Sequence, residues 1–218
     1  MNPLVAIFIV VLAVPLLAGS WRLALAGLGA QAVLVFFMMF AGGHEVHTDT
    51  AVLLALDLLL IRGLLGPLWL RSATLRAGTR RDLEVVPGNL LHWVVGLTLV
   101  VLAASFAQRV APDDPWRAAH FGAAAAEVLI GLAVVAQHRS PLAQVIGVLT
   151  IENGVLLFEA TIDYHWPAAL HVGIAAMFGG LIVLSSYYLR ALAALPPEPD
   201  EPASLAAQEP VLCRCSSR

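Results

Sequence analysis

The sequence contains no lysine and few charged residues of any kind. All 12 basic residues are arginines, and charged residues make up only 12% of the 218 positions, about half the share in an average soluble protein. The net charge of −3 leaves no long basic or acidic run that would attract nucleic acid or another strongly charged partner. This scarcity of charge excludes nucleic-acid-binding proteins and ordinary soluble enzymes.

Cysteine and catalytic motifs are equally scarce. The only two cysteines, Cys213 and Cys215, lie at the carboxyl end and cannot cross-link the rest of the chain, which excludes a disulfide scaffold. They also supply too few ligands for a structural zinc site. Because we find no activated nucleophile, phosphate-binding loop or nucleotide fingerprint, the sequence offers no site for covalent or phosphoryl chemistry.

Apolar residues are abundant instead. They form 60% of the chain, and the mean hydropathy is +0.85, which is typical of an integral membrane protein. Runs of about 20 apolar residues are long enough to cross a bilayer, and in lipid such runs fold as helices. The sequence therefore predicts an all-α membrane bundle of about seven transmembrane helices, approximately at 3–20, 22–41, 51–71, 89–110, 118–137, 142–161 and 168–190.

The seven segments form one predicted domain over residues 1–190. The proline-rich and acidic remainder, 191–218, predicts a disordered tail. No basic residue precedes the first apolar run, so we interpret that run as a retained helix and not as a signal peptide. Small residues, such as Gly173 with Gly180, predict close helix packing, and Pro67 predicts a kink in the third segment.

The arginines predict the orientation of the bundle. If the loops after the first, third and fifth segments share one side with the tail, that side carries nine arginines and the other side carries two. By the positive-inside rule, the amino terminus then lies outside and the tail lies in the cytoplasm.

Ionisable side chains inside the apolar segments are the candidate functional residues. Placing one such side chain at mid-bilayer costs at least about 2.5–3.5 kcal/mol, so each is expected to have a functional or structural role. Arg62, Glu127 and Glu152 lie about halfway along their segments, with Asn153 beside Glu152. Asp57 and Glu159 lie nearer the outer face, and Glu159 follows Glu152 by two helical turns on the same helix face.

Two interpretations of these residues follow. In the first, protons move between buried carboxylates whose affinity is set by desolvation and by the cation at Arg62. In the second, the same side chains pair once and hold helices together without titrating. The cost of a buried charge favours the relay for Glu127 and Glu152, whereas both interpretations stand equally for Asp57 and Glu159.

The histidines raise a haem or metal alternative. Of the histidines in the apolar segments, only His120 and His171 lie at one depth, so bis-histidine haem ligation has little support. The sequence His-Glu-Val-His at 44–47, followed by Asp49, lacks the spacing of a zinc-protease helix motif. The sequence therefore predicts no cofactor and no metal for this chain.

Two of the segments resemble the glutamate helices of the small K subunit of respiratory complex I. These are the alanine-rich run from Ala123 to Ala133, which contains Glu127, and the run from Ile146 to Gly154, which contains Glu152. Their order along the chain is the reverse of the order in that subunit.

A resemblance that covers most of the chain is to component E of hydrogenase-4, a membrane subunit of group 4 nickel–iron hydrogenase and formate hydrogenlyase-like complexes. It is carried by the seven segments, the reversed order, the Glu-Asn-Gly element at 152–154, and a central cation, Arg62, before Gly66-Pro67-Leu68. Many members have lysine at that position. Because arginine is much harder to deprotonate, Arg62 is expected to act as a fixed counter-charge.

This resemblance implies a non-catalytic subunit of an oxidoreductase complex in the bacterial inner membrane. Its partners would be antiporter-like membrane subunits, hydrogenase and iron–sulfur subunits, and membrane lipids, with no nucleic acid. Electron transfer would take place on those partners. The chain itself would relay protons or charge through Glu127 and Glu152.

Overall fold

The computed structural model describes residues 3–17, 20–41, 48–76, 90–138, 140–161 and 168–194, which form helices and short connections with no strands. Six of its helical segments are long and apolar enough to cross a membrane, as the sequence predicts. The tail, including Cys213 and Cys215, and the stretch 42–47 lie outside the described residues. The helices are α1 (Pro3–Leu12), α2 (Val14–Leu17), α3 (Trp21–Ala41), α4 (Thr48–Ala55), η1 (Leu56–Leu65), α5 (Gly66–Arg76), α6 (Leu90–Val110), α7 (Pro115–Gln137), α8 (Pro141–Ala160) and α9 (Ala168–Ala193).

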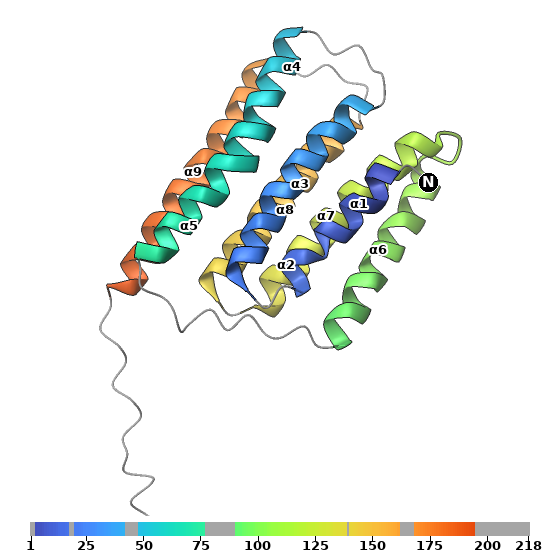
Figure 1. Ribbon diagram of the computed structural model, residues 1–218. Coiled ribbons are helices and arrows are strands. Elements are labelled where there is room, and N and C mark those ends of the chain that lie inside the picture. The colour runs from blue at the N-terminus through green and yellow to red at the C-terminus, as the bar shows by residue number, and fades with distance from the viewer. Residues whose placement is uncertain are drawn as a thin grey trace, which may run out of the picture.

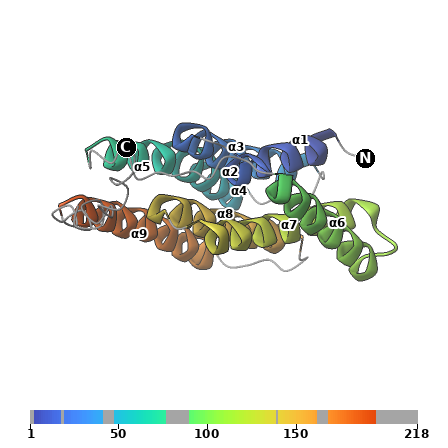
Figure 2. The same ribbon diagram turned by 90° about the horizontal axis from the view of Figure 1, so that it is seen from below.

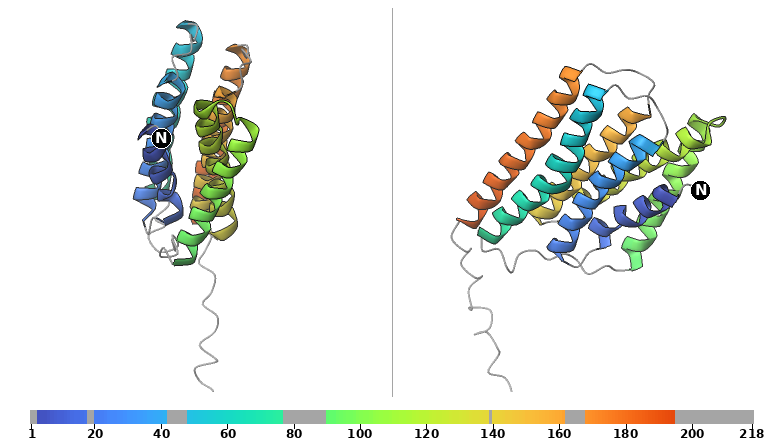
Figure 3. Two further views of the ribbon diagram at one scale, coloured as in Figure 1. Left: turned by 90° about the vertical axis from the view of Figure 1, so that its right-hand side faces the viewer. Right: turned by 45° about the horizontal axis from the view of Figure 1, so that its top comes forward.

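The helices form two layers (Figures 1 and 2). One layer contains α1 to α5, and the other contains α7, α8 and α9, with α6 at the edge beside α7. Across the layers, α9 packs along α5 and α8 along α3, while α1 contacts α7. Figure 3 shows the two layers edge-on. This arrangement places residues from the first third of the chain directly against residues from its last third.

The bundle has two ends, which we name by the helices that meet there. At face A, α6 ends, α7 begins, α8 ends and α9 begins; at face B, α3 begins, α5 ends, α8 begins and α9 ends. Arg22, Arg71, Arg76 and Arg190 lie toward face B, whereas Arg109 and Arg117 lie at face A.

The first segment differs from the sequence prediction. A single helix over 3–20 does not form; α1 ends at Leu12, α2 covers only Val14–Leu17, and α1 is too short to cross a bilayer by itself. Proline has no backbone N–H and its ring clashes with the carbonyl four residues before it. Pro15 therefore interrupts the helix within its second half.

The third segment departs from α geometry in the turns before Pro67, the residue at which the sequence predicts a kink. From Leu56 to Leu65 its hydrogen bonds follow the π-helical pattern, and α geometry resumes at Gly66, one residue before Pro67. The ribbon nevertheless runs continuously from α4 to α5 (Figure 1). π-Helical turns are rare and occur frequently at functional sites, and this one contains both Asp57 and Arg62.

Glycines set the closest helix contacts, although not at every predicted position. A Cβ atom on Gly131 would lie 2.8 Å from the carbonyl oxygen of Gly147, and one on Gly29 would lie 2.6 Å from that of Gly63. α7 and α8, and likewise α3 and η1, therefore touch backbone to backbone. The predicted packing role of Gly173 and Gly180 is wrong for the described chain, because nothing lies within 4 Å of a Cβ at either position.

Candidate functional site

The side chain of Arg62 lies at the centre of the bundle and is completely buried. Its Nε donates a hydrogen bond to Oδ2 of Asp57 at 2.9 Å, and its Nη1 donates one to Oδ1 of Asn153 at 3.0 Å. Its Nη2 lies 3.7 Å from Oε1 of Glu152. The guanidinium carbon also stacks 4.1 Å from the centre of the Phe178 ring. Arg62 thus joins η1, α8 and α9 in one polar cluster.

The π-helical register explains why Asp57 and Arg62 can pair. In an α-helix, residues five apart point about 140° away from each other. In the π-helix of η1, backbone hydrogen bonds connect residues five apart, so Asp57 and Arg62 lie over one another on one face. Asn153 and Glu152 then approach from α8 in the facing layer. The sequence predicts a carboxylate partner for Arg62 but not which one.

Glu127 lies at the same depth on α7. It is fully buried, and neither of its carboxylate oxygens has a hydrogen-bond partner among the described residues. The charge that acts on it is that of Arg62. An unpaired carboxylate in such a position is costly, so Glu127 needs water, a proton or a cation that these side chains do not supply.

Toward face A, the cluster continues through Glu159 near the end of α8. Its Oε1 lies 3.3 Å from Nδ1 of His171 near the start of α9, and both side chains are largely buried. The charges of Arg62 and Asp57 also act on Glu159. The predicted step from Glu152 outward to Glu159 therefore gains a third member, His171, which the sequence analysis considers only as a haem ligand.

Several polar atoms of this cluster are buried without a hydrogen-bond partner in the described chain. They include Oδ1 of Asp57, both oxygens of Glu152 and Glu159, and Nδ2 of Asn153. Buried polar groups in native proteins are almost always hydrogen-bonded to protein or to ordered water. The cluster therefore has the donors and acceptors to hold internal water molecules.

The histidines do not form the haem pair that the sequence analysis considers. His120 stacks on Trp116, with ring centres 4.0 Å apart, and its Nδ1 lies 2.9 Å from the carbonyl oxygen of Trp116. His171 instead faces Glu159. His92 and His138, near face B, form an unpredicted pair with ring centres 6.3 Å apart. Within the described residues, no group of three histidine, cysteine or acidic side chains is arranged to hold a metal ion.

Two other buried residues at this depth are not among the site residues predicted from the sequence. Gln31 is completely buried in the middle of α3, with neither amide atom hydrogen-bonded to a described residue. It is the only polar side chain between Leu23 and Ala41, a signal that could have identified it. Phe178 gives no such signal, because an aromatic residue in an apolar helix is indistinguishable from ordinary core.

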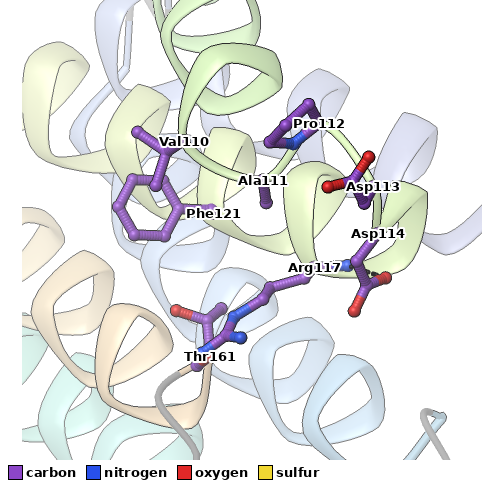
Figure 4. A pocket seen from close by; sticks show the side chains of 8 residues that line it. All are labelled: Val110, Ala111, Pro112, Asp113, Asp114, Arg117, Phe121 and Thr161. Carbon is purple, nitrogen blue, oxygen red and sulfur yellow. Dashed lines mark hydrogen bonds between the residues drawn. The ribbon is translucent and has the colours of Figure 1, made fainter.

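A separate pocket of about 400 Å³ opens at face A between the α6–α7 turn and the end of α8. It is lined by Asp113, Asp114, Arg117 and Phe121 among others, and Figure 4 shows Arg117 extending toward Thr161. Asp114 caps α7 by accepting hydrogen bonds from the backbone of Trp116 and Arg117. Arg117 donates from Nε to the Thr161 carbonyl at 3.0 Å. These contacts hold the start of α7 against the end of α8.

No protein-family model, no curated protein and no solved structure matches this chain.

Proposed function

We propose that this chain is a membrane subunit of a group 4 hydrogenase or complex I-like complex, and that it relays protons or charge at mid-membrane. The observation that carries the proposal is the cluster of Arg62, Asp57, Glu152 and Asn153, buried at the centre of helices long enough to span a bilayer. Ionisable groups at this depth mark proton relays and ion pathways.

The charge balance of the cluster supports a relay over a permanent set of ion pairs. Four buried carboxyl groups, on Asp57, Glu127, Glu152 and Glu159, lie in the described helices with one buried guanidinium, that of Arg62, which contacts Asp57 and Glu152. One cation cannot compensate four anions in a medium of low dielectric. Protons bound by the carboxylates or by His171 beside Glu159, or a cation from another chain, must supply the balance, and each source makes the charge state variable.

The surface of the chain supports a role as a subunit. The face of α8 that carries Glu152 and Glu159 also carries Val155, which is 53% exposed. The two carboxylates therefore border the outer surface at the depth of lipid, where contact with hydrocarbon is unfavourable. A partner membrane subunit that covers this face would shield them. The partners we propose are antiporter-like membrane subunits, with hydrogenase and iron–sulfur subunits carrying the redox centres.

The distribution of arginines supports a placement in the bacterial inner membrane with face B in the cytoplasm. Arg22, Arg71, Arg76 and Arg190 lie toward face B, against Arg109 and Arg117 at face A. Cytoplasmic ends of membrane helices carry the excess of arginine and lysine. The amino terminus would then lie outside and the carboxyl-terminal tail inside.

Substitution of Glu152 tests the proposed function. Glu152→Gln keeps the size of the side chain but removes its exchangeable charge, so we expect the assembled complex to lose ion translocation while its subunits remain together. Translocation is measured in inverted vesicles, and assembly by co-purification. Asp113→Asn, an acidic residue outside the cluster, is the matched control. Unchanged translocation in Glu152→Gln would exclude the relay.

A second function, a purely structural anchor, is favoured by the contacts of Arg62 with η1, α8 and α9. In that case the cluster serves only to hold helices together. Glu152→Gln would then impair assembly, or have no effect, but would not separate translocation from assembly. The same two measurements therefore distinguish the two functions.

A further inference from the structure

The buried acidic groups of this chain are distributed unevenly between the two faces. Glu127 and Glu152 lie at mid-depth, and Asp57 and Glu159 lie between mid-depth and face A. The other described acidic side chains, Asp113 and Asp114, are at face A itself. Within the described part of the chain, no acidic side chain lies between the cluster and face B.

The half of the bundle toward face B contains no buried acidic side chain among the described residues. Apolar side chains fill much of it, beside buried polar residues such as His92, Ser140 and Ser186, each of which has a side-chain atom without a hydrogen-bond partner in the described chain. One buried cluster there takes residues from α3, α5, α8 and α9, the helices that continue toward face B beyond the Arg62 cluster. We call these residues the apolar seal, and they are Ala24, Leu25, Leu28, Leu70, Leu142, Ile146, Leu149, Phe178, Ile182 and Leu189. Phe178 carries the Arg62 guanidinium on its ring, so the seal begins directly beneath the cation.

The half toward face A also has an apolar core, which includes Val35, Leu58 and Leu156, but η1 and α8 carry buried polar side chains there as well. Unpartnered buried atoms occur there on Asp57, Glu152, Asn153, Glu159 and His171. They belong to η1, α8 and α9. They extend from the centre of the bundle to the first turn of α9 at face A. Water molecules that satisfy these atoms would connect the mid-membrane cluster to face A.

We propose that this chain contains a hydrated half-channel that opens at face A beside Glu159 and His171, ends at Arg62, and is closed toward face B by the apolar seal. The half-channel binds water molecules, and protons would move along them. The Glu159–His171 contact at 3.3 Å forms the mouth. The use of this channel for proton transfer rests on the proposed function, but its hydration does not. Any second path, from the cluster to face B, would then belong to a partner subunit.

Accessibility to a small water-soluble reagent tests the half-channel without measuring translocation. In native membranes, with Cys213 and Cys215 replaced by serine, single cysteines are introduced as Asp57→Cys, Glu159→Cys, Ile146→Cys and Leu149→Cys. A membrane-impermeant cationic thiol reagent is applied to vesicles of either orientation. We expect labelling of Asp57→Cys and Glu159→Cys from face A only, and no labelling of Ile146→Cys or Leu149→Cys from either face.

Labelling of Ile146→Cys or Leu149→Cys from face B would overturn the seal, and failure to label Asp57→Cys or Glu159→Cys from face A would overturn the channel.

A second measurement needs no substitution, in case a variant does not fold. A water-soluble carbodiimide is expected to modify Glu159 of the unsubstituted protein from face A and not from face B, as read by peptide mass spectrometry. Modification of Glu159 from face B would likewise contradict the proposal. If the labelling pattern holds while Glu152→Gln still translocates ions, the half-channel stands and the proposed function fails.

Discussion

At the scale of single residues, Arg62 is the side chain that joins the polar cluster. It is fully buried, yet its guanidinium has two hydrogen bonds, one longer ion pair and an aromatic ring beneath it. Arginine suits this position because its planar guanidinium group presents several hydrogen-bond donors at once and stays charged. This fixed positive charge stabilises an ionised carboxylate next to it, at Asp57 or Glu152.

Removal of that cation is expected to destabilise the fold. Breaking a buried ion pair by deleting one partner typically costs about 3–5 kcal/mol, because the other charge remains buried. We therefore expect Arg62→Met to lower the unfolding temperature in detergent markedly. Arg71→Met, at an exposed position of α5, is the control. Equal unfolding temperatures for the two variants would contradict this role of Arg62.

Glu127 leads to the opposite expectation for stability. Its buried carboxylate has no hydrogen-bond partner among the described residues, and a neutral amide is less costly to bury than a charge. We expect Glu127→Gln to raise the free energy of unfolding by about 1 kcal/mol or more, while ion translocation by the assembled complex falls. Thermal unfolding and vesicle assays measure the two effects. A clear loss of stability would mean that Glu127 has a structural partner.

At the scale of elements, the helix pairs are defined by where backbones can touch. Gly131 and Gly147 bring α7 against α8, so the two helices that carry Glu127 and Glu152 are held at a short distance. α9 offers the contrast, because Gly173, Gly179 and Gly180 have nothing within 4 Å of a Cβ. The same residue type thus has a packing function on α7 and none within this chain on α9.

This contrast predicts changes in stability of opposite sign when alanine replaces Gly131 or Gly180. In Gly131→Ala, the added methyl group would approach the Gly147 carbonyl oxygen at 2.8 Å, and overpacking of this kind costs typically 1–3 kcal/mol. Gly180→Ala adds a better helix former in open space and should stabilise α9 by up to about 1 kcal/mol. Thermal unfolding of the isolated chain distinguishes the two. Equal effects would show that the α7–α8 contact is looser than described.

At the scale of the whole molecule, the arginine-rich end predicts the orientation in the membrane. If face B is cytoplasmic, the native Cys213 and Cys215 lie inside the cell. We expect an impermeant thiol reagent to leave them unlabelled in intact spheroplasts and to label them after the membrane is opened, detected by mass spectrometry. Labelling in intact spheroplasts would reverse the orientation. An introduced cysteine at Asp113, at face A, is the matched positive control.

Much of the architecture follows from the sequence because helix formation in lipid is local. Each long apolar run satisfies its own backbone hydrogen bonds, so six of the seven predicted segments are observed as long helices. The exception is the first segment, where Pro15 interrupts the helix although the surrounding residues are apolar. The depth of Arg62, Glu127 and Glu152 follows equally from the sequence, because each helical residue advances by 1.5 Å.

The identity of the contacts depends on rotation about each helix axis and on which helices are neighbours, and no local pattern specifies either. Asp57 meets Arg62 only because η1 adopts the π register. Asn153 and Phe178 reach Arg62 only because the two layers face each other there. The sequence by itself determined the membrane helices and the depth of their buried charges, because both depend on hydrogen bonds and hydrophobicity within one segment. Only the tertiary structure decided which charges meet, which stay unpaired and which face they communicate with, because those are contacts between segments far apart in the chain.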